Sequence, residues 1–186
     1  MQPGDAYRAY GGLYCEMRGM EVRMRMESAL KRYYGTMKGK RVAVIGLGVS
    51  NRPLVESMLD AGVPVLACDK RRREEFGGLI EALERRGMTA ALGPGYLDRL
   101  DGADIIFRTP GMRPDVPQIA RAVSAGAKLT SEMEAFLDLC PCRIIAVTGS
   151  DGKTTTTTII AGLLKAAGYR TFVGGNIGTP LLCRVD

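Results

Sequence analysis

The sequence predicts an α/β fold in which parallel strands alternate with helices. From residue 41 onward, short apolar runs rich in β-branched residues alternate with amphipathic segments of helical period. Two of these runs end in glycine-rich turns that open a helical segment, at residues 46–51 and 148–155. The order strand, glycine-rich turn, helix is typical of parallel sheets in which the helix N-termini bind phosphate groups.

The length and hydropathy of the chain fit a globular protein. It has 186 residues, of which 46% are hydrophobic and 25% are charged. This length suffices for one large domain or one and a half. No apolar run approaches the ~18 residues of a membrane span, and the N-terminus lacks a secretory signal. We therefore expect no membrane partner and no secretion.

Charge and cysteine content narrow the partners further. The net charge of +6 suits either nucleic acid or anionic small molecules, but no base-reading module accompanies the basic residues. We therefore expect small anions and no nucleic acid. In the absence of histidine, the five scattered cysteines do not predict a zinc site, and reduced thiols favour a cytoplasmic location. These cysteines are Cys15, Cys68, Cys140, Cys142 and Cys183.

The second glycine-rich turn has the pattern of a phosphate-binding loop. The apolar run from Arg143 to Val147 predicts a strand, and the helix behind the loop is expected to bury Ile159, Ile160, Leu163 and Leu164. The backbone N–H groups of the loop would face an anion, Lys153 would reach the terminal phosphates, and the Thr154 hydroxyl would hold Mg²⁺. Val147 stands where the standard motif has its first glycine, so a simple turn with a solvated lysine is the alternative. The ATP-binding candidates are Gly149, Ser150, Asp151, Gly152, Lys153, Thr154 and Thr155.

The first glycine-rich turn follows a predicted strand at residues 41–45 and resembles a dinucleotide fingerprint without its third glycine, which is Asn51 here. A helix ending at Gly62 and a strand over residues 63–68 then deliver Asp69, 21 residues after Gly48. That offset is usual for an acidic residue that meets a ribose or base. A nicotinamide oxidoreductase is therefore an alternative, which the missing glycine and the basic run at residues 70–73 disfavour.

The same alternation continues to residue 139. Further strands are predicted over residues 88–92, 104–107 and 127–129, and helices over 76–86, 115–125 and 131–139. Asp115 is expected to cap the second of these helices, and Ser131 with Glu134 forms a capping box for the third. The turn at residues 108–112 follows a strand at its carboxyl end, where open α/β sheets bind ligands.

Three parts of the chain are expected. Residues 1–37 form a partly helical N-terminal extension, with a helix over residues 21–34, and residues 38–140 form a Rossmann-like parallel-sheet domain. Residues 141–186 begin a P-loop α/β ATPase domain. One strand–loop–helix–strand unit cannot cover both faces of a parallel sheet, so this second domain is expected to be truncated.

The motifs of both glycine-rich turns resemble the Mur ligase superfamily of ATP-dependent amide ligases in peptidoglycan synthesis. The resemblance rests on Thr148 to Thr155, Gly175 to Gly178, Thr109 to Gly111 and Ser131 to Glu134. They look most like the branch that adds D-glutamate to UDP-N-acetylmuramoyl-L-alanine. The L-alanine-adding branch usually has histidine where Asp151 stands, and it is kept as an alternative.

The resemblance implies a role for each site residue. Lys153 and Thr154 would be catalytic, with ATP and Mg²⁺ activating the alanyl carboxylate as an acyl phosphate that the D-glutamate amine attacks. The turn after residue 45 would bind the diphosphate, Arg71 a phosphate, and Asp69 and Lys70 would border the uracil and ribose. The implied UDP-substrate residues are Gly48, Val49, Ser50, Asp69, Lys70, Arg71, Gly111 and Asn176.

A monomeric fragment that binds substrate without turnover is the leading interpretation. The resemblance also implies that later metal ligands and the D-glutamate site lie beyond residue 186. A non-catalytic UDP-sugar-binding protein is the alternative from a different functional class.

Overall fold

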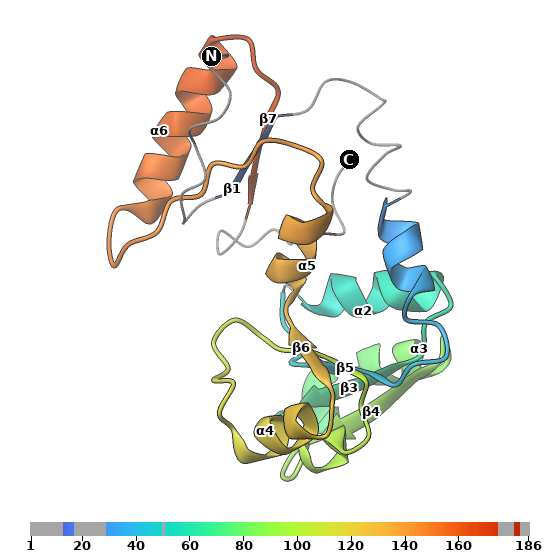
Figure 1. Cartoon of the computed structure of the whole chain (residues 1–186). Helices are drawn as coiled ribbons and strands as arrows, with labels where there is room; N and C mark the ends of the chain where they lie inside the picture. Colours follow the sequence, from blue (N-terminus) through green and yellow to red (C-terminus); the bar gives the residue numbers. More distant parts are fainter. Residues whose placement is uncertain (1–12, 17–28, 50, 175–180, 183–186) are drawn as a thin grey trace.

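The structure is a computed structural model that describes residues 13–16, 29–49, 51–174 and 181–182. Strands and helices alternate along most of the chain (Figure 1). The strands are β1 Leu13–Glu16, β2 Val42–Ile45, β3 Val65–Asp69, β4 Met88–Leu92, β5 Ile105–Phe107, β6 Lys128–Thr130 and β7 Thr171–Gly174. The α-helices are α2 Asn51–Asp60, α3 Leu79–Glu84, α4 Pro117–Ser124, α5 Glu132–Leu139 and α6 Lys153–Ala166, with a further helix at residues 29–35.

A parallel sheet forms the centre of the first part of the molecule. Within the described residues its five strands lie in the order β4-β3-β2-β5-β6, and each neighbouring pair is parallel. Val44 of β2 lies between Ala67 of β3 and Phe107 of β5. The predicted α/β class is therefore confirmed for this sheet. The order reverses between β2 and β5, and such a switch point opens a crevice at the carboxyl ends of the strands.

Helices cover both faces of this sheet. Val42 and Val44 of β2 pack in one apolar cluster with Leu54 of α2 and Ile80 of α3. Their neighbours Ala43 and Ile45 pack in a second cluster that includes Ile119 of α4. Successive strand residues point to opposite faces, so a run buried on both sides must be apolar throughout. Because β2 is buried along its whole length, all four of its residues are apolar.

Residues before 38 also contribute to the core. Tyr34 and Met37 are almost fully buried in the same apolar cluster as Val44 of β2 and Leu54 of α2. The Tyr34 hydroxyl donates to Ser57 Oγ at 3.2 Å. Tyr33 is only partly buried against this cluster, whereas Tyr34 is one of its buried residues.

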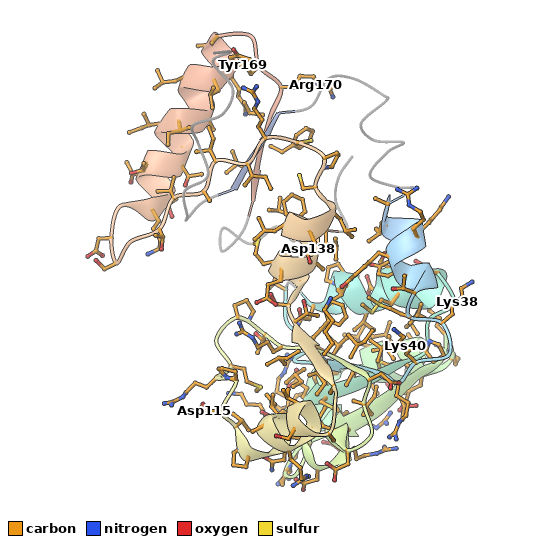
Figure 2. The ribbon with its side chains drawn as sticks, in the orientation of Figure 1. Lys38, Lys40, Asp115, Asp138, Tyr169 and Arg170 are labelled. Atoms are coloured by element: carbon orange, nitrogen blue, oxygen red, sulfur yellow. The ribbon has the colours of Figure 1, made fainter. Side chains whose placement is uncertain are left out.

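Two predicted helix boundaries are wrong. The helix predicted over residues 76–86 is shorter in the structure: a 3₁₀ turn at Arg73–Phe76 ends before it, and α3 begins at Leu79. Gly77 and Gly78 both adopt positive φ and separate the two. Asp115 does not cap α4. The N-cap is Val116, and the Asp115 carboxylate accepts from Arg113 Nε at 2.9 Å on the surface (Figure 2).

The part that follows α5 departs from the expected parallel unit. The predicted strand at Arg143–Val147 is absent, and residue 144 alone forms a bridge. A strand requires a neighbour for its backbone hydrogen bonds, and β7 pairs antiparallel with β1 instead. Among the described residues no second parallel sheet forms around α6 and β7.

The packing predicted for α6 is also wrong. Ile159 is 57% exposed and Leu163 is 67% exposed, whereas Thr157 and Ala161 are buried. Ile160 and Leu164 are half-buried. The larger apolar side chains of α6 therefore lack the sheet that the sequence pattern requires.

Across the described part of the chain, every helix is too short or too polar to cross a membrane.

The Phe107 side chain provides a test of the core. It is fully buried in β5 between neighbouring strands. We expect Phe107→Ala to lower the free energy of unfolding by about 3–5 kcal/mol, because it leaves a cavity at the centre of the sheet. Urea denaturation measures this, and Val123→Ala on the surface of α4 should change the same quantity by less than about 1 kcal/mol. Equal effects of the two variants would contradict the described core.

Candidate nucleotide-binding site

Three turns meet at the carboxyl edge of the parallel sheet. Gly46 follows β2 with φ of +85°, and its N–H donates to the Cys68 carbonyl of β3 at 2.7 Å. A Cβ atom on Gly46 would lie 3.6 Å from Thr109 Cβ, so the turn after β5 is in contact with the turn after β2. The positive φ favours glycine at position 46, whereas a Cβ at this distance from Thr109 would make an ordinary van der Waals contact. The first glycine-rich turn is thus held between its two neighbouring strands.

Asp69 lies at the end of β3 and is 5% exposed. Its Oδ2 accepts from Leu47 N at 2.7 Å and from Arg71 Nη2 at 2.8 Å. Its Oδ1 accepts from Arg71 N at 2.9 Å and from Arg71 Nε at 3.1 Å. A carboxylate offers about four acceptor positions. The protein itself therefore uses the acceptor capacity of Asp69.

These contacts shift the pKa of the Asp69 carboxyl. Burial by itself raises the pKa, but the hydrogen bonds from Arg71 and Leu47 outweigh it, so the pKa lies below its ordinary value. The hydrogen bond to Asp69 raises the pKa of the Arg71 guanidinium in turn. Asp69 is thus a charged group that fixes the turn after β2.

Arg71 is held on three sides. Besides Asp69, its Nη2 donates to the Leu47 carbonyl at 3.0 Å, and its guanidinium carbon lies 4.2 Å from the centre of the Phe76 ring. Within the described residues, Nη1 has no hydrogen-bond partner, and the side chain is 39% exposed. An arginine fixed in this way presents two N–H groups to an anion.

The other basic residues of the run 70–73 have different surroundings. Arg73 donates to Glu84 at 2.7 Å and to Glu81 at 3.0 Å, so its charge is paired on the surface. Lys70 is exposed. Arg72 lines an open hollow of about 350 Å³ with Gly93 and Pro94. Arg71 is therefore the member of this run that faces the turn after β2.

Asn51 takes the place of the third glycine of the fingerprint. It is 3% exposed at the start of α2, and its Nδ2 donates to the Ile45 carbonyl at 2.8 Å. Its Oδ1 has no partner in the described part of the chain. The carboxamide ties α2 to β2 from inside the turn. This residue was noted in the sequence as a departure from the fingerprint, and its structural role was missed.

The turn after β5 is braced by β6 and α5. Arg108 N donates to the Thr130 carbonyl at 2.9 Å, and the Arg108 guanidinium contacts Met112 O at 3.2 Å and Glu134 at 3.6 Å. Gly111 is exposed at the tip of this turn. Gly48 and Val49 are likewise exposed on the neighbouring turn. Ser50 and Asn176, predicted to bind the substrate, lie outside the described residues.

The phosphate-loop candidate sits apart from this edge, at the start of α6. Gly152 is the N-cap of α6 with φ of +75°, and α6 begins at Lys153. Lys153 Nζ donates to the carbonyls of Gly149 at 2.6 Å and Ser150 at 2.7 Å. The lysine thus folds back over the loop, with an exposed helix N-terminus behind it. Asp151, Thr154 and Thr155 are exposed beside it.

A magnesium ion would find one protein ligand here. The Thr154 hydroxyl is exposed at the N-terminus of α6, and its own carbonyl accepts from Thr158 Oγ1 at 2.9 Å. No cluster of three or more Asp, Glu, Cys or His side chains that could hold a metal occurs in the described residues. This arrangement fits a metal whose other ligands are phosphate oxygens and water, as is usual for Mg²⁺.

Comparison with protein families identifies the first part of the chain. Residues 40–131 match the family described as Mur ligase MurD-like, N-terminal domain. The chain belongs to the Mur ligase family.

Curated relatives of this Mur ligase chain are bacterial ligases. It is 50% identical over 161 residues to UDP-N-acetylmuramoylalanine--D-glutamate ligase of Clostridium botulinum (strain Loch Maree / Type A3). It is 52% identical over 161 residues to the ligase of the same name from Ruminiclostridium cellulolyticum. Each alignment covers 87% of this chain and 35% of the relative, so the chain spans about a third of the length of these ligases.

Among solved structures, shikimate dehydrogenase from Aquifex aeolicus matches this Mur ligase chain with a TM-score of 0.39 and 16% identity. The match covers 67% of this chain and 56% of the dehydrogenase. At that level the similarity adds nothing to the functional argument.

The Asp69 network predicts a pH dependence of stability. Because the folded-state pKa of Asp69 is lowered, its stabilising contribution is complete above the unfolded pKa of ~3.9 and is lost as the pH falls through the folded value. We expect Asp69→Asn to lower the free energy of unfolding by about 2–3 kcal/mol at pH 7, the scale of charge-assisted hydrogen bonds. Urea denaturation at pH 7 and pH 2.5 should show this difference shrinking at the lower pH. A difference that is the same at both pH values would contradict an ionised Asp69.

Proposed function

We propose that this chain binds the uridine diphosphate part of UDP-N-acetylmuramoyl-L-alanine at the carboxyl edge of its parallel sheet and ATP at the Gly149–Thr155 loop. In this proposal it is part of an ATP-dependent ligase that adds D-glutamate to the alanyl carboxylate during peptidoglycan synthesis. The observation that carries the proposal is Arg71: its Nη2 donates to the Leu47 carbonyl, next to the exposed Gly48 and Val49, and its Nη1 N–H groups have no partner among the described residues. The relationship to named D-glutamate ligases supports the same substrate.

The geometry disfavours a nicotinamide dinucleotide at this edge. In dinucleotide-binding folds the acidic residue after the second strand accepts hydrogen bonds from a ribose. Here all four acceptor positions of Asp69 are used by Leu47 and Arg71. Asn51 also fills the position where a third glycine allows close helix packing beside the pyrophosphate. Asp69 would therefore border the nucleotide by shaping the turn, while backbone N–H groups and Arg71 bind the phosphates.

The Gly149–Thr155 loop, the second of the two proposed anion sites, would activate the alanyl carboxylate of the UDP substrate. ATP with Mg²⁺ would transfer its γ-phosphoryl group to the alanyl carboxylate and leave as ADP. The amine of D-glutamate would then attack the resulting acyl phosphate, forming the amide and releasing phosphate. The repulsion between the two anions is the electrostatic difficulty of this step. Lys153 would leave its contacts with Gly149 and Ser150 to bind the terminal phosphates, and the Thr154 hydroxyl would ligate the metal. Gly149 to Gly152 would offer backbone N–H groups, and Thr155 would support the loop.

The remaining parts of the reaction lie with the rest of the ligase. We infer that this chain alone is a monomer that binds the UDP substrate in the cytoplasm without turnover. The D-glutamate site and further metal ligands would come from the remaining two thirds of a protein of the relatives' length.

Isothermal titration of the 186-residue chain tests the proposed function directly. UDP-N-acetylmuramoyl-L-alanine and UDP should both bind, while NADH should not. Binding of NADH in competition with UDP would contradict the proposal, as would a failure of both uridine ligands to bind.

Arg71 should contribute to the affinity for the diphosphate. We expect Arg71→Ala to weaken UDP binding by about 1–3 kcal/mol, because a fixed charge-assisted contact is lost. Arg73→Ala is the matched control, since Arg73 is paired with Glu81 and Glu84 on the surface. An unchanged UDP affinity in Arg71→Ala would remove Arg71 from the site.

Lys153 should act on turnover and not on the UDP substrate. In a whole ligase that contains this sequence, we expect Lys153→Ala to lower turnover by orders of magnitude while the affinity for the UDP substrate stays within about twofold. Steady-state kinetics and substrate titration measure the two quantities. Lys165→Ala at the other end of α6 is the control. Equal loss of turnover and substrate affinity would show that the two anion sites are not divided as proposed.

A further inference from the structure

A hollow of about 260 Å³ lies at the amino edge of the parallel sheet. The first residues of β2 and β3 line it, where Ala43 pairs with Leu66. Arg99 of the 3₁₀ turn at Asp98–Leu100 and Ala103 before β5 complete the wall. Parallel strands have their amino ends at one edge and their carboxyl ends at the other. This amino-edge hollow is therefore separate from the candidate nucleotide-binding site.

Part of the lining of the amino-edge hollow is apolar. Ala43, Leu66 and Ala103 pack in the apolar cluster that includes Ile119 of α4. Leu66 and Ala103 are only partly buried in that cluster, so part of their apolar surface stays accessible. Ligand pockets commonly combine such apolar surface with a few polar groups that fix the orientation of the ligand.

The charged part of the lining consists of three cations, Lys40, Arg41 and Arg99. All three residues are exposed, and Lys40 is labelled in Figure 2. Within the described part of the chain, none of the three side chains forms an ion pair. Arg113 and Arg121, in contrast, are each paired with an aspartate on the surface.

The carboxylates of the neighbouring segment 98–104 are engaged elsewhere. Asp98 and Asp101 accept hydrogen bonds from side chains of α4, at 3.1 Å and 2.8 Å. Asp104 Oδ2 accepts from the backbone N–H of Arg41 at 2.7 Å and not from its guanidinium. The three cations therefore leave an excess of positive charge around the hollow, which favours an anionic ligand.

The fold restricts two of these cations. The Arg41 carbonyl accepts from Asp104 N at 2.9 Å, so its backbone is tied to the start of β5. A Cβ atom on Gly102 would displace Arg41 Nη1, which shows that the guanidinium lies against this turn. Arg99 Nη1 lies 3.5 Å from the Ala90 carbonyl of β4. The planar guanidinium is preorganised for phosphate oxygens, so less freedom is lost for each hydrogen bond that forms.

Glu132, a buried carboxylate that the proposed chemistry does not use, is satisfied by the chain itself. It is 5% exposed at the start of α5, and its Oε1 accepts from Leu182 N at 2.7 Å. The backbone of Leu181 also hydrogen-bonds it, and these bonds oppose the rise in pKa that burial causes. Both leucines are buried in the same apolar cluster as Phe136. Glu132 therefore needs no ligand, unlike the cations of the amino-edge hollow.

We propose that the amino-edge hollow binds a small phosphate monoester, whose phosphate group contacts Arg41 and Arg99 and whose apolar body lies against Leu66. A phosphate monoester carries nearly two negative charges at pH 7 and presents three acceptor oxygens to such cations. The volume of about 260 Å³ is below the roughly 300–1,000 Å³ of pockets for drug-sized ligands, so the ligand is small. The inference does not depend on the proposed function, because the two sites lie at opposite edges of the sheet.

Phenyl phosphate is the probe for this site, because it joins a dianion to an apolar ring. We expect it to bind the 186-residue chain with a dissociation constant of about 1 mM, the scale for a ligand of this size. Inorganic phosphate and phenol each supply one half of the probe and should bind about tenfold more weakly. Heteronuclear NMR titration locates the probe, since the backbone amides of Leu66, Thr89 and Ala103 should shift.

A pair of variants tests the role of the cations. Arg99→Gln should weaken phenyl phosphate binding about tenfold, because a charge-assisted hydrogen bond is lost. Arg113→Gln is the matched control. It removes the same charge from an exposed arginine that is paired with Asp115, and it should leave the affinity unchanged.

Four results would overturn the inference. The first is the absence of shifts at the three amides of the hollow, and the second is a set of shifts confined to residues 46–49, which would place the probe at the carboxyl edge. The third is equal binding of phenyl phosphate and either of its halves. The fourth is an equal effect of Arg99→Gln and Arg113→Gln, which would reduce the binding to net charge.

Discussion

The hydrogen bonds of Asp69 are the interaction on which the candidate nucleotide site depends. One carboxylate holds the backbone of the turn after β2, through Leu47, and the backbone and guanidinium of Arg71 in the turn after β3. Burying a charge is costly unless it is fully hydrogen-bonded, and here both oxygens accept two bonds each. The exposed part of the turn and the unused side of Arg71 owe their positions to this network.

The parallel sheet could be predicted from the sequence because burial on both faces leaves a continuous apolar run. The run at residues 41–45 has this character and became β2. The equally apolar run at residues 143–147 did not become a strand, because strand formation depends on a distant partner that local pattern does not reveal. The break at Gly77 and Gly78 and the N-cap at Val116 were missed, since several neighbouring residues fit the same turn chemistry.

The candidate site was predictable in its location and less so in its contacts. Spacing alone placed Gly48 and Asp69 at neighbouring strand ends, and the structure brings their turns together through Leu47. Spacing did not indicate that the Asp69 carboxylate is saturated by the protein, because that depends on where the Arg71 side chain turns. Glu132 gave no signal, since the capping pattern of Ser131 and Glu134 already accounted for an acidic residue there.

The buried Glu132 has a consequence for where the chain can be cut. A recombinant product that stops near residue 140 would omit Leu181 and Leu182, uncovering Phe136 and leaving a desolvated carboxylate without its backbone donors. One that starts at residue 38 would lose Tyr34 and Met37 from the same apolar cluster. Autonomous folding of this sheet therefore depends on sequence from both of its flanks.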